Sequence, residues 1–143
     1  MSIIKLEKTY PVPKEVLWEY LIRDELLSLW CMPSKGFALA KGQKFEFNIP
    51  KNIFFSGTFG NKVIDFHNEE FLSYQCTATK PKLDTIVKWT LIEKSDETKL
   101  VLEHSGFKKS QWLTKIMLTT GWKKMMNGHL YEKLIKTNSK TKS

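Results

Sequence analysis

Alternating hydrophobic and polar positions in the middle of the chain predict a series of β-strands. Within residues 44–49, Phe45 and Phe47 alternate with polar side chains, as in a strand with one buried face. Similar alternation recurs through residues 43–106, where short polar segments such as residues 95–98 separate the strands. Short connections between neighbouring strands are typical of an antiparallel meander, so we expect about six strands here.

One part of this region is irregular, and the preceding residues add a strand and two helices. Gly57 and Gly60-Asn61 interrupt the segment 53–66, which fits either a bulge or a hairpin. Upstream, residues 3–10 predict a strand, and Pro13 begins a helix that continues through Leu21. Asp24 can cap a second short helix over residues 25–29, followed by a loop over residues 31–42.

A long amphipathic helix is predicted after residue 108. Apolar side chains recur there at spacings of three and four, on a stripe formed by Trp122, Met125, Met126, His129, Leu130 and Leu134. The expected fold class is therefore α+β: a curved antiparallel sheet of about six to seven strands around a long C-terminal helix, with two short helices after the first strand. We expect one domain over residues 1–137 and a flexible Lys-rich tail over residues 138–143.

Length and composition fit a single soluble domain. The 143 residues are 41% hydrophobic and 27% charged, and no apolar run approaches the ~20 residues of a membrane span. The polar N-terminus does not resemble a signal peptide, so we expect a cytoplasmic protein. Cys31 and Cys76 form no CxxC motif, which is consistent with reduced thiols.

The net charge of +8 comes almost entirely from lysine, because Arg23 is the sole arginine. Nucleic-acid readers rely on the planar arginine guanidinium, so we expect no nucleic-acid partner.

Two of the three histidines are candidates for a role inside the fold. His104 shares the inward parity of Leu100 and Leu102, and His129 lies on the apolar stripe of the last helix, whereas His67 is expected on the surface. Each inward histidine is either a core residue with a satisfied ring or a group that binds a polar ligand end or transfers protons. No metal site or cofactor is expected, because these histidines lack further ligands. No nucleophile motif is present, so catalysis is not favoured and no catalytic residue is assigned.

Aromatic and sulfur-containing side chains provide a second set of candidates. Such residues fill a core, or they line a pocket for an apolar or aromatic molecule. The candidate ligand-binding set is Trp30, Phe45, Phe47, Tyr74, Trp89, His104, Trp122, Met125, Met126 and His129. This hypothesis requires a cavity of several hundred Å³ between sheet and helix.

Five stretches in order resemble a known superfamily over residues 3–136. They are PVPKEVLWEYL with DELLSLW, KGQKFEFN, VIDFHNEEFLSY, VKWTLIEKSDETKLVLEHSGF and GWKKMMNGHLYEKL. Together they resemble the SRPBCC (START-like, helix-grip) superfamily, in the branch related to the C-terminal domain of the activator of heat-shock protein 90 ATPase. The resemblance implies a helix-grip fold with a cavity. Relatives include binders of lipids and hormones, polyketide cyclases and co-chaperone domains, so fold alone leaves function open.

Three hypotheses follow. The first is a cytoplasmic helix-grip protein that binds a hydrophobic or amphipathic small molecule in its cavity without turnover. The second, implied by the resemblance, is a co-chaperone-like interaction module with a chaperone partner and a role in stress response. The third is a cyclase or hydrolase type of enzyme that uses His104 or His129. A monomer and a homodimer both fit the sequence.

Overall fold

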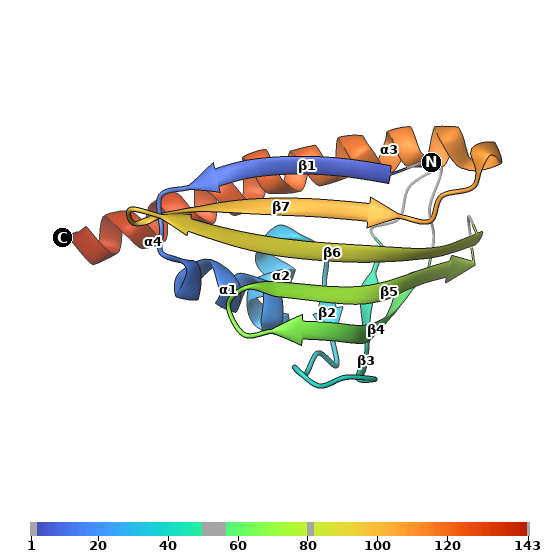
Figure 1. Ribbon diagram of the computed structural model, residues 1–143, viewed down its shortest axis with the longest axis horizontal. Coiled ribbons are helices and arrows are strands. Elements are labelled where there is room, and N and C mark those ends of the chain that lie inside the picture. Colours follow the sequence, from blue (N-terminus) through green and yellow to red (C-terminus); the bar gives the residue numbers. More distant parts are fainter. Residues whose placement is uncertain (1–2, 50–56, 80–81, 143) are drawn as a thin grey trace.

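The computed structural model describes residues 3–49, 57–79 and 82–142, with side chains through residue 136. Its centre is a seven-stranded antiparallel sheet with strand order β1-β7-β6-β5-β4-β3-β2 (Figure 1). The strands are β1 (Ile3–Tyr10), β2 (Ser34–Lys35), β3 (Lys44–Asn48), β4 (Thr58–His67), β5 (Phe71–Thr79), β6 (Lys82–Lys94) and β7 (Glu97–Ser105). The α+β class and the curved sheet expected from the sequence are confirmed, with the two-residue β2 as an additional strand.

The helices follow the predicted order. They are α1 (Lys14–Ile22), α2 (Asp24–Trp30), η1 (Lys109–Gln111), α3 (Trp112–Lys124), η2 (Met125–Leu130) and α4 (Tyr131–Lys142). The last three join into one long helical region that passes behind the strands in Figure 1. No helix among the described residues is both long and apolar enough to cross a bilayer.

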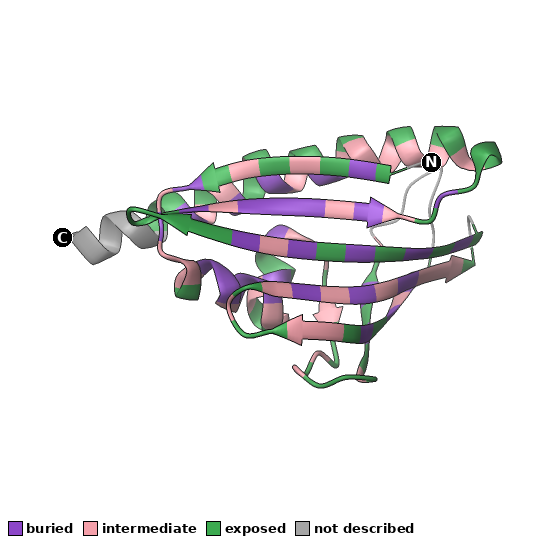
Figure 2. Cartoon of the chain, viewed as in Figure 1, coloured by how far each residue is buried: buried purple, intermediate pink, exposed green. Residues whose placement is uncertain are grey.

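Strand pairing places the first strand beside the last. β1 pairs antiparallel with β7, so that Ile3 lies opposite Ser105, and the remaining strands follow as a meander. Ser95 and Asp96 connect β6 to β7 with positive φ values of 50° and 66°, the conformation that a tight two-residue hairpin turn needs. Buried and exposed residues alternate along β6 (Figure 2), as the period-2 pattern predicted.

Two local predictions in this region are corrected. Gly60 and Asn61 lie inside β4 and pair with β5, and the register shift falls between Val63 and Asp65 instead. A Cβ added at Gly60 would lie 3.3 Å from the Thr77 hydroxyl. The absence of a side chain at Gly60 therefore allows β5 to approach closely. Gly57 immediately precedes β4 and has a φ of 90°, and residues 53–56 of the predicted segment lie outside the described residues.

The carboxylate of Asp24 has a different role from the expected cap. Asp24 is the first residue of α2, and its carboxylate accepts hydrogen bonds from the Ser34 hydroxyl and from the backbone N–H groups of Gly36 and Phe37. The side chain therefore fixes the loop after α2 instead of the helix terminus. This interaction brings residues 31–37 back against the sheet.

The long helix contains a π-helical interruption. In η2 the backbone turns are wider than in an α-helix, and the Tyr10 hydroxyl donates a 2.7 Å hydrogen bond to the Met126 carbonyl. Beyond η2, Leu130 and Leu134 are fully buried. The backbone of α4 is helical through Lys142, and the flexibility of residues 138–143 stays a prediction.

Candidate functional site

A pocket of about 350 Å³ lies between the inner face of the sheet and helix α3. The sheet contributes aromatic, aliphatic and thiol side chains, and α3 contributes a wall that contains Met117, Gly121 and Trp122. Among the described residues, the lining consists of Cys31, Met32, Phe47, Ile49, Phe59, Tyr74, Cys76, Val87, His104, Met117, Leu118, Gly121, Trp122, Lys124, Met125 and His129. The loop after α2, the strands β3 to β7 and the long helix therefore all contribute residues to one site.

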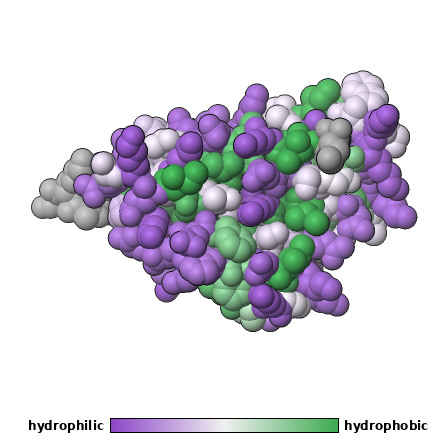
Figure 3. All heavy atoms as spheres, viewed as in Figure 1, coloured by the Kyte–Doolittle hydropathy of each residue, from purple (hydrophilic) through white to green (hydrophobic). Residues whose placement is uncertain are grey.

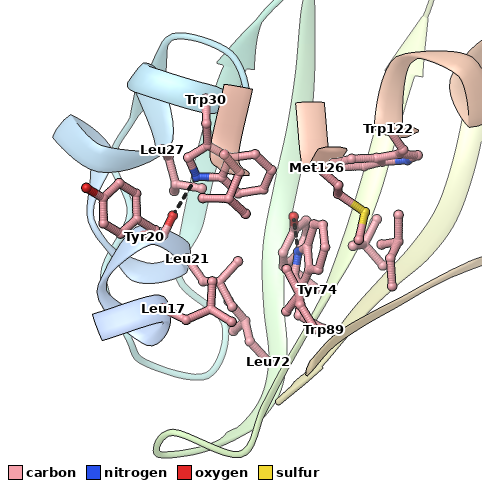
Figure 4. Packing of buried hydrophobic residues seen from close by; sticks show 14 of the residues in the cluster. Leu17, Tyr20, Leu21, Leu27, Trp30, Leu72, Tyr74, Trp89, Trp122 and Met126 are labelled. Carbon is pink, nitrogen blue, oxygen red and sulfur yellow. Dashed lines mark hydrogen bonds between the residues drawn. The ribbon is translucent and has the colours of Figure 1, made fainter. Parts of the chain in front are cut away.

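Six of the ten candidate residues from the sequence line this pocket. They are Phe47, Tyr74, His104, Trp122, Met125 and His129. The other four are buried in the adjoining core: Trp30, Phe45, Trp89 and Met126. Figure 4 shows part of this packing, and the rings of Trp30 and Trp89 meet edge to face with centroids 5.8 Å apart. Any role of the ten residues in ligand binding stays a prediction.

His104 lies in the middle of a chain of hydrogen bonds. The indole N–H of Trp122 donates to His104 Nδ1 at 3.1 Å, which makes Nε2 the protonated ring nitrogen. His104 Nε2 lies 2.8 Å from the Thr85 hydroxyl, and that hydroxyl donates to the Cys76 carbonyl. Burial lowers the pKa of His104 to about 4. The ring is therefore neutral at pH 7, and both of its nitrogens have partners.

Tyr74 provides a polar group within the aromatic part of the site. The indole N–H of Trp89 donates a 3.1 Å hydrogen bond to the Tyr74 hydroxyl (Figure 4). Among the described residues, none accepts a hydrogen bond from this hydroxyl in return. Burial, as the largest cause, raises the pKa of Tyr74 well above its ordinary value, so the phenol keeps its proton. The Tyr74 O–H is thus a neutral donor.

The exposed part of the pocket lining includes a lysine and a histidine. Lys124 and His129 are both exposed, and both line the pocket. The prediction that His129 lies on the buried stripe of the helix is wrong, because the wide turns of η2 change the angular position of residues 125–130. Among the described lining residues, none is Asp or Glu.

Sulfur-containing side chains are concentrated in this pocket. The lining includes Cys31, Met32, Cys76, Met117 and Met125. Burial raises the pKa of the Cys31 thiol above its usual range and that of Cys76 to about 12, so both are neutral thiols. Thiols and thioethers are soft, polarizable groups that adapt to apolar ligands. Cys31 and Met32 were not in the predicted set, because no local pattern indicates that their loop returns to the sheet.

Two alternatives to this pocket are a metal centre and a second hollow on the surface, and neither offers a better site than the pocket. Within the described residues, no cluster of three or more His, Cys, Asp and Glu side chains could hold a metal ion. A wider hollow of about 620 Å³ lies over β3, β4 and β5, where Lys44, Glu46, Lys62 and Gln75 contribute polar side chains. Its lining lacks the enclosed aromatic surface of the first pocket.

Comparison with known proteins gives a family and a set of similar folds. The family described as "Activator of Hsp90 ATPase homolog 1-like protein" matches residues 11–134. No curated protein shows significant similarity to the chain. Protein MLL2253 from Mesorhizobium loti has a similar structure, with a TM-score of 0.82 and 24% identity over 95% of this chain and 98% of that one. The solution structure of the Aha1 dimer from Colwellia psychrerythraea gives a TM-score of 0.77 at 17% identity, covering 94% of this chain and 96% of that chain.

Proposed function

This chain belongs to the Activator of Hsp90 ATPase homolog 1-like family, and we propose that it binds a small apolar molecule with an anionic or hydrogen-bond-accepting end. The pocket beneath α3 is the binding site in this proposal. Its combination of an apolar interior with an exposed lysine and an exposed histidine is the observation that carries the proposal. Binding is expected without chemical conversion of the ligand.

The interior suits the apolar part of such a ligand. Phe47, Phe59 and Val87 contribute hydrocarbon surface from the sheet, and Leu118 and Met125 contribute it from the helix. The volume of about 350 Å³ is near the lower end of the ~300–1,000 Å³ found for small-molecule pockets. A single small ligand is therefore expected.

Two groups of polar atoms favour an anionic or accepting end. The Tyr74 hydroxyl accepts a hydrogen bond from Trp89, and in this proposal it donates its own proton to a ligand oxygen. In the exposed part of the lining, Lys124 supplies a positive charge and His129 a second nitrogen donor or acceptor. With no carboxylate among the described lining residues, an anion meets no direct repulsion there.

The state of His104 supports binding over catalysis. Trp122 donates to one ring nitrogen, and the other lies 2.8 Å from the Thr85 hydroxyl. A general base needs a free lone pair near its substrate, and a pKa of about 4 makes this imidazole a weak base at neutral pH. His104 is better suited to fixing Trp122 as part of the pocket wall.

The test uses two glycines of the long helix. An added Cβ at Gly121 or at Gly128 meets no heavy atom within 4 Å, and only Gly121 lines the pocket. Gly121→Leu should fill the pocket, whereas Gly128→Leu is a matched control. We expect decanoate to displace the fluorescent probe 8-anilinonaphthalene-1-sulfonate from the wild type and from Gly128→Leu, and Gly121→Leu to lose probe binding by tenfold or more.

Head-group preference gives a separate readout. Decanol has the same alkyl chain as decanoate and no charge, so it should displace the probe more weakly, and Lys124→Gln should reduce that difference. Equal probe binding by both leucine variants would refute the pocket as the site. Native mass spectra of freshly purified protein would also reveal any retained molecule of a few hundred daltons.

The co-chaperone alternative stays a prediction and has its own test. Stimulation of a heat-shock protein 90 ATPase by this chain, unaffected by Gly121→Leu, would favour an interaction module over a ligand-binding protein.

A further inference from the structure

The first turns of α3 present an apolar face to solvent. Trp112, Leu113 and Ile116 are 63%, 50% and 54% exposed, although a helix on a sheet usually directs such side chains inward. Trp122 is the first buried residue of α3. Hydrophobic residues in the view of Figure 3 are interspersed with hydrophilic ones. Three large apolar side chains on one helix face are therefore a distinct surface feature.

The helical segment that carries this face, with the residues that flank it, has charges of a single sign. From residue 104 to residue 131 the sequence contains no Asp or Glu, and it contains five lysines. Lys108 and Lys109 precede the apolar face, and Lys123 and Lys124 follow it; all four are exposed. Such a surface is electrostatically complementary to an anionic partner.

The face is held in place by its connection to the sheet. Phe107 is buried immediately before the helical region, and the Gln111 side-chain amide donates a 2.6 Å hydrogen bond to the Lys82 carbonyl. The Gln111 side-chain oxygen accepts a hydrogen bond from the Lys108 backbone N–H. These contacts orient the start of α3 relative to β6.

We propose that Trp112, Leu113 and Ile116 dock the protein onto an anionic phospholipid bilayer. An exposed tryptophan among aliphatic side chains suits the boundary between headgroups and acyl chains, and flanking lysines pair with lipid phosphates and carboxylates. Met117 and Leu118, which follow on the same helix, line the pocket. The docked helix thus also forms a wall of the pocket, although docking does not require the pocket to hold a ligand.

The arrangement of tryptophans allows a direct measurement. Trp18, Trp30, Trp89 and Trp122 are at most 5% exposed, so Trp112 is the tryptophan that a changed environment should affect most. Mixing the protein with phosphatidylserine/phosphatidylcholine vesicles should shift tryptophan emission to shorter wavelength, and brominated acyl chains should quench it. Pure phosphatidylcholine vesicles should give little change. Trp112→Phe should lose most of the optical signal while still co-sedimenting with the anionic vesicles.

Paired variants separate docking from misfolding. Trp112→Ser with Ile116→Ser should abolish co-sedimentation, whereas Ile92→Ser, at an exposed isoleucine of β6, should leave it unchanged. Lys108→Gln with Lys109→Gln should weaken binding by about fivefold per lysine at low salt. Probe binding in the pocket should persist in all of these variants, so failure of docking is distinguishable from failure of the proposed ligand site.

Three results would overturn the proposal. One is equal binding to anionic and zwitterionic vesicles, and another is unchanged binding of the double serine variant. The third is a concentration-dependent dimer, seen by analytical ultracentrifugation without lipid and lost in the double serine variant, which would assign the face to a second copy of the chain.

Discussion

Replacing His104 with glutamine tests the buried hydrogen-bond chain and gives a stability difference that depends on pH. At pH 7.5 the variant loses the ring that links Trp122 to Thr85, which leaves the buried indole N–H without its acceptor. The expected cost is about 1–3 kcal/mol in the free energy of unfolding.

Acid removes this advantage of the wild type. The pKa of His104 is lowered from its ordinary 6.5 to about 4 in the folded protein, because burial disfavours the imidazolium. The histidine contribution is therefore fully present above pH 6.5, and it decreases as the unfolded chain takes up a proton that the folded protein does not bind. Each pH unit between 6.5 and 4 removes about 1.4 kcal/mol, for a total of about 3 kcal/mol.

Urea denaturation of both proteins at half-unit steps from pH 7.5 to 4.5 measures the effect. Titrating carboxyl groups destabilise both proteins alike, so the difference between wild type and His104→Gln isolates the histidine. That difference should shrink steadily below pH 6.5. His67→Gln controls for the loss of an imidazole at an exposed position, where the ring nitrogen Nδ1 lies 2.7 Å from the Glu70 carboxylate. A constant difference between wild type and His104→Gln over the whole range would refute a neutral, buried His104.

Three other substitutions test separate parts of the structure. Asp24→Ala removes the acceptor for the Ser34 hydroxyl and for two backbone N–H groups, and should lower the free energy of unfolding by about 2–3 kcal/mol in urea; an unchanged midpoint would contradict this role. Tyr10→Phe removes the donor to the Met126 carbonyl and should cost about 1 kcal/mol, with faster amide hydrogen exchange in η2 than elsewhere in the helix. Gly121→Ala should raise thermal stability by up to about 1 kcal/mol, since the added methyl meets open space in a helix; a lower melting temperature would show that the site is already filled.

Strand alternation made the sheet predictable from the sequence. Phe45, Phe47 and Trp89 are all buried, as their parity with neighbouring apolar residues indicated. The strands of an antiparallel meander show an alternating pattern because one face of the sheet packs against the core and the other faces solvent. The same parity could not divide pocket residues from core residues: Phe47 lines the pocket and Phe45 does not.

The remaining differences depend on contacts between distant segments. His129 was assigned to a buried stripe by counting α-helical turns, and the π-helical turns of η2 place it in an exposed position. Asp24 bonds to a loop 10–13 residues away, so its local sequence favoured a cap. At Gly121 no heavy atom lies within 4 Å of an added Cβ, so the missing side chain does not serve the close approach of another element.

The π-helical segment separates the long helix into two parts that can change independently during evolution. In a continuous α-helix, inserting one residue rotates all later side chains by about 100°, which would take Leu130 and Leu134 out of the core. A π-turn holds an additional residue, so deletion of one residue within Met125–Leu130 can convert it to α-helix without reorienting either flank. A change of one residue in length within this segment can therefore be absorbed while the C-terminal half retains its place against the sheet.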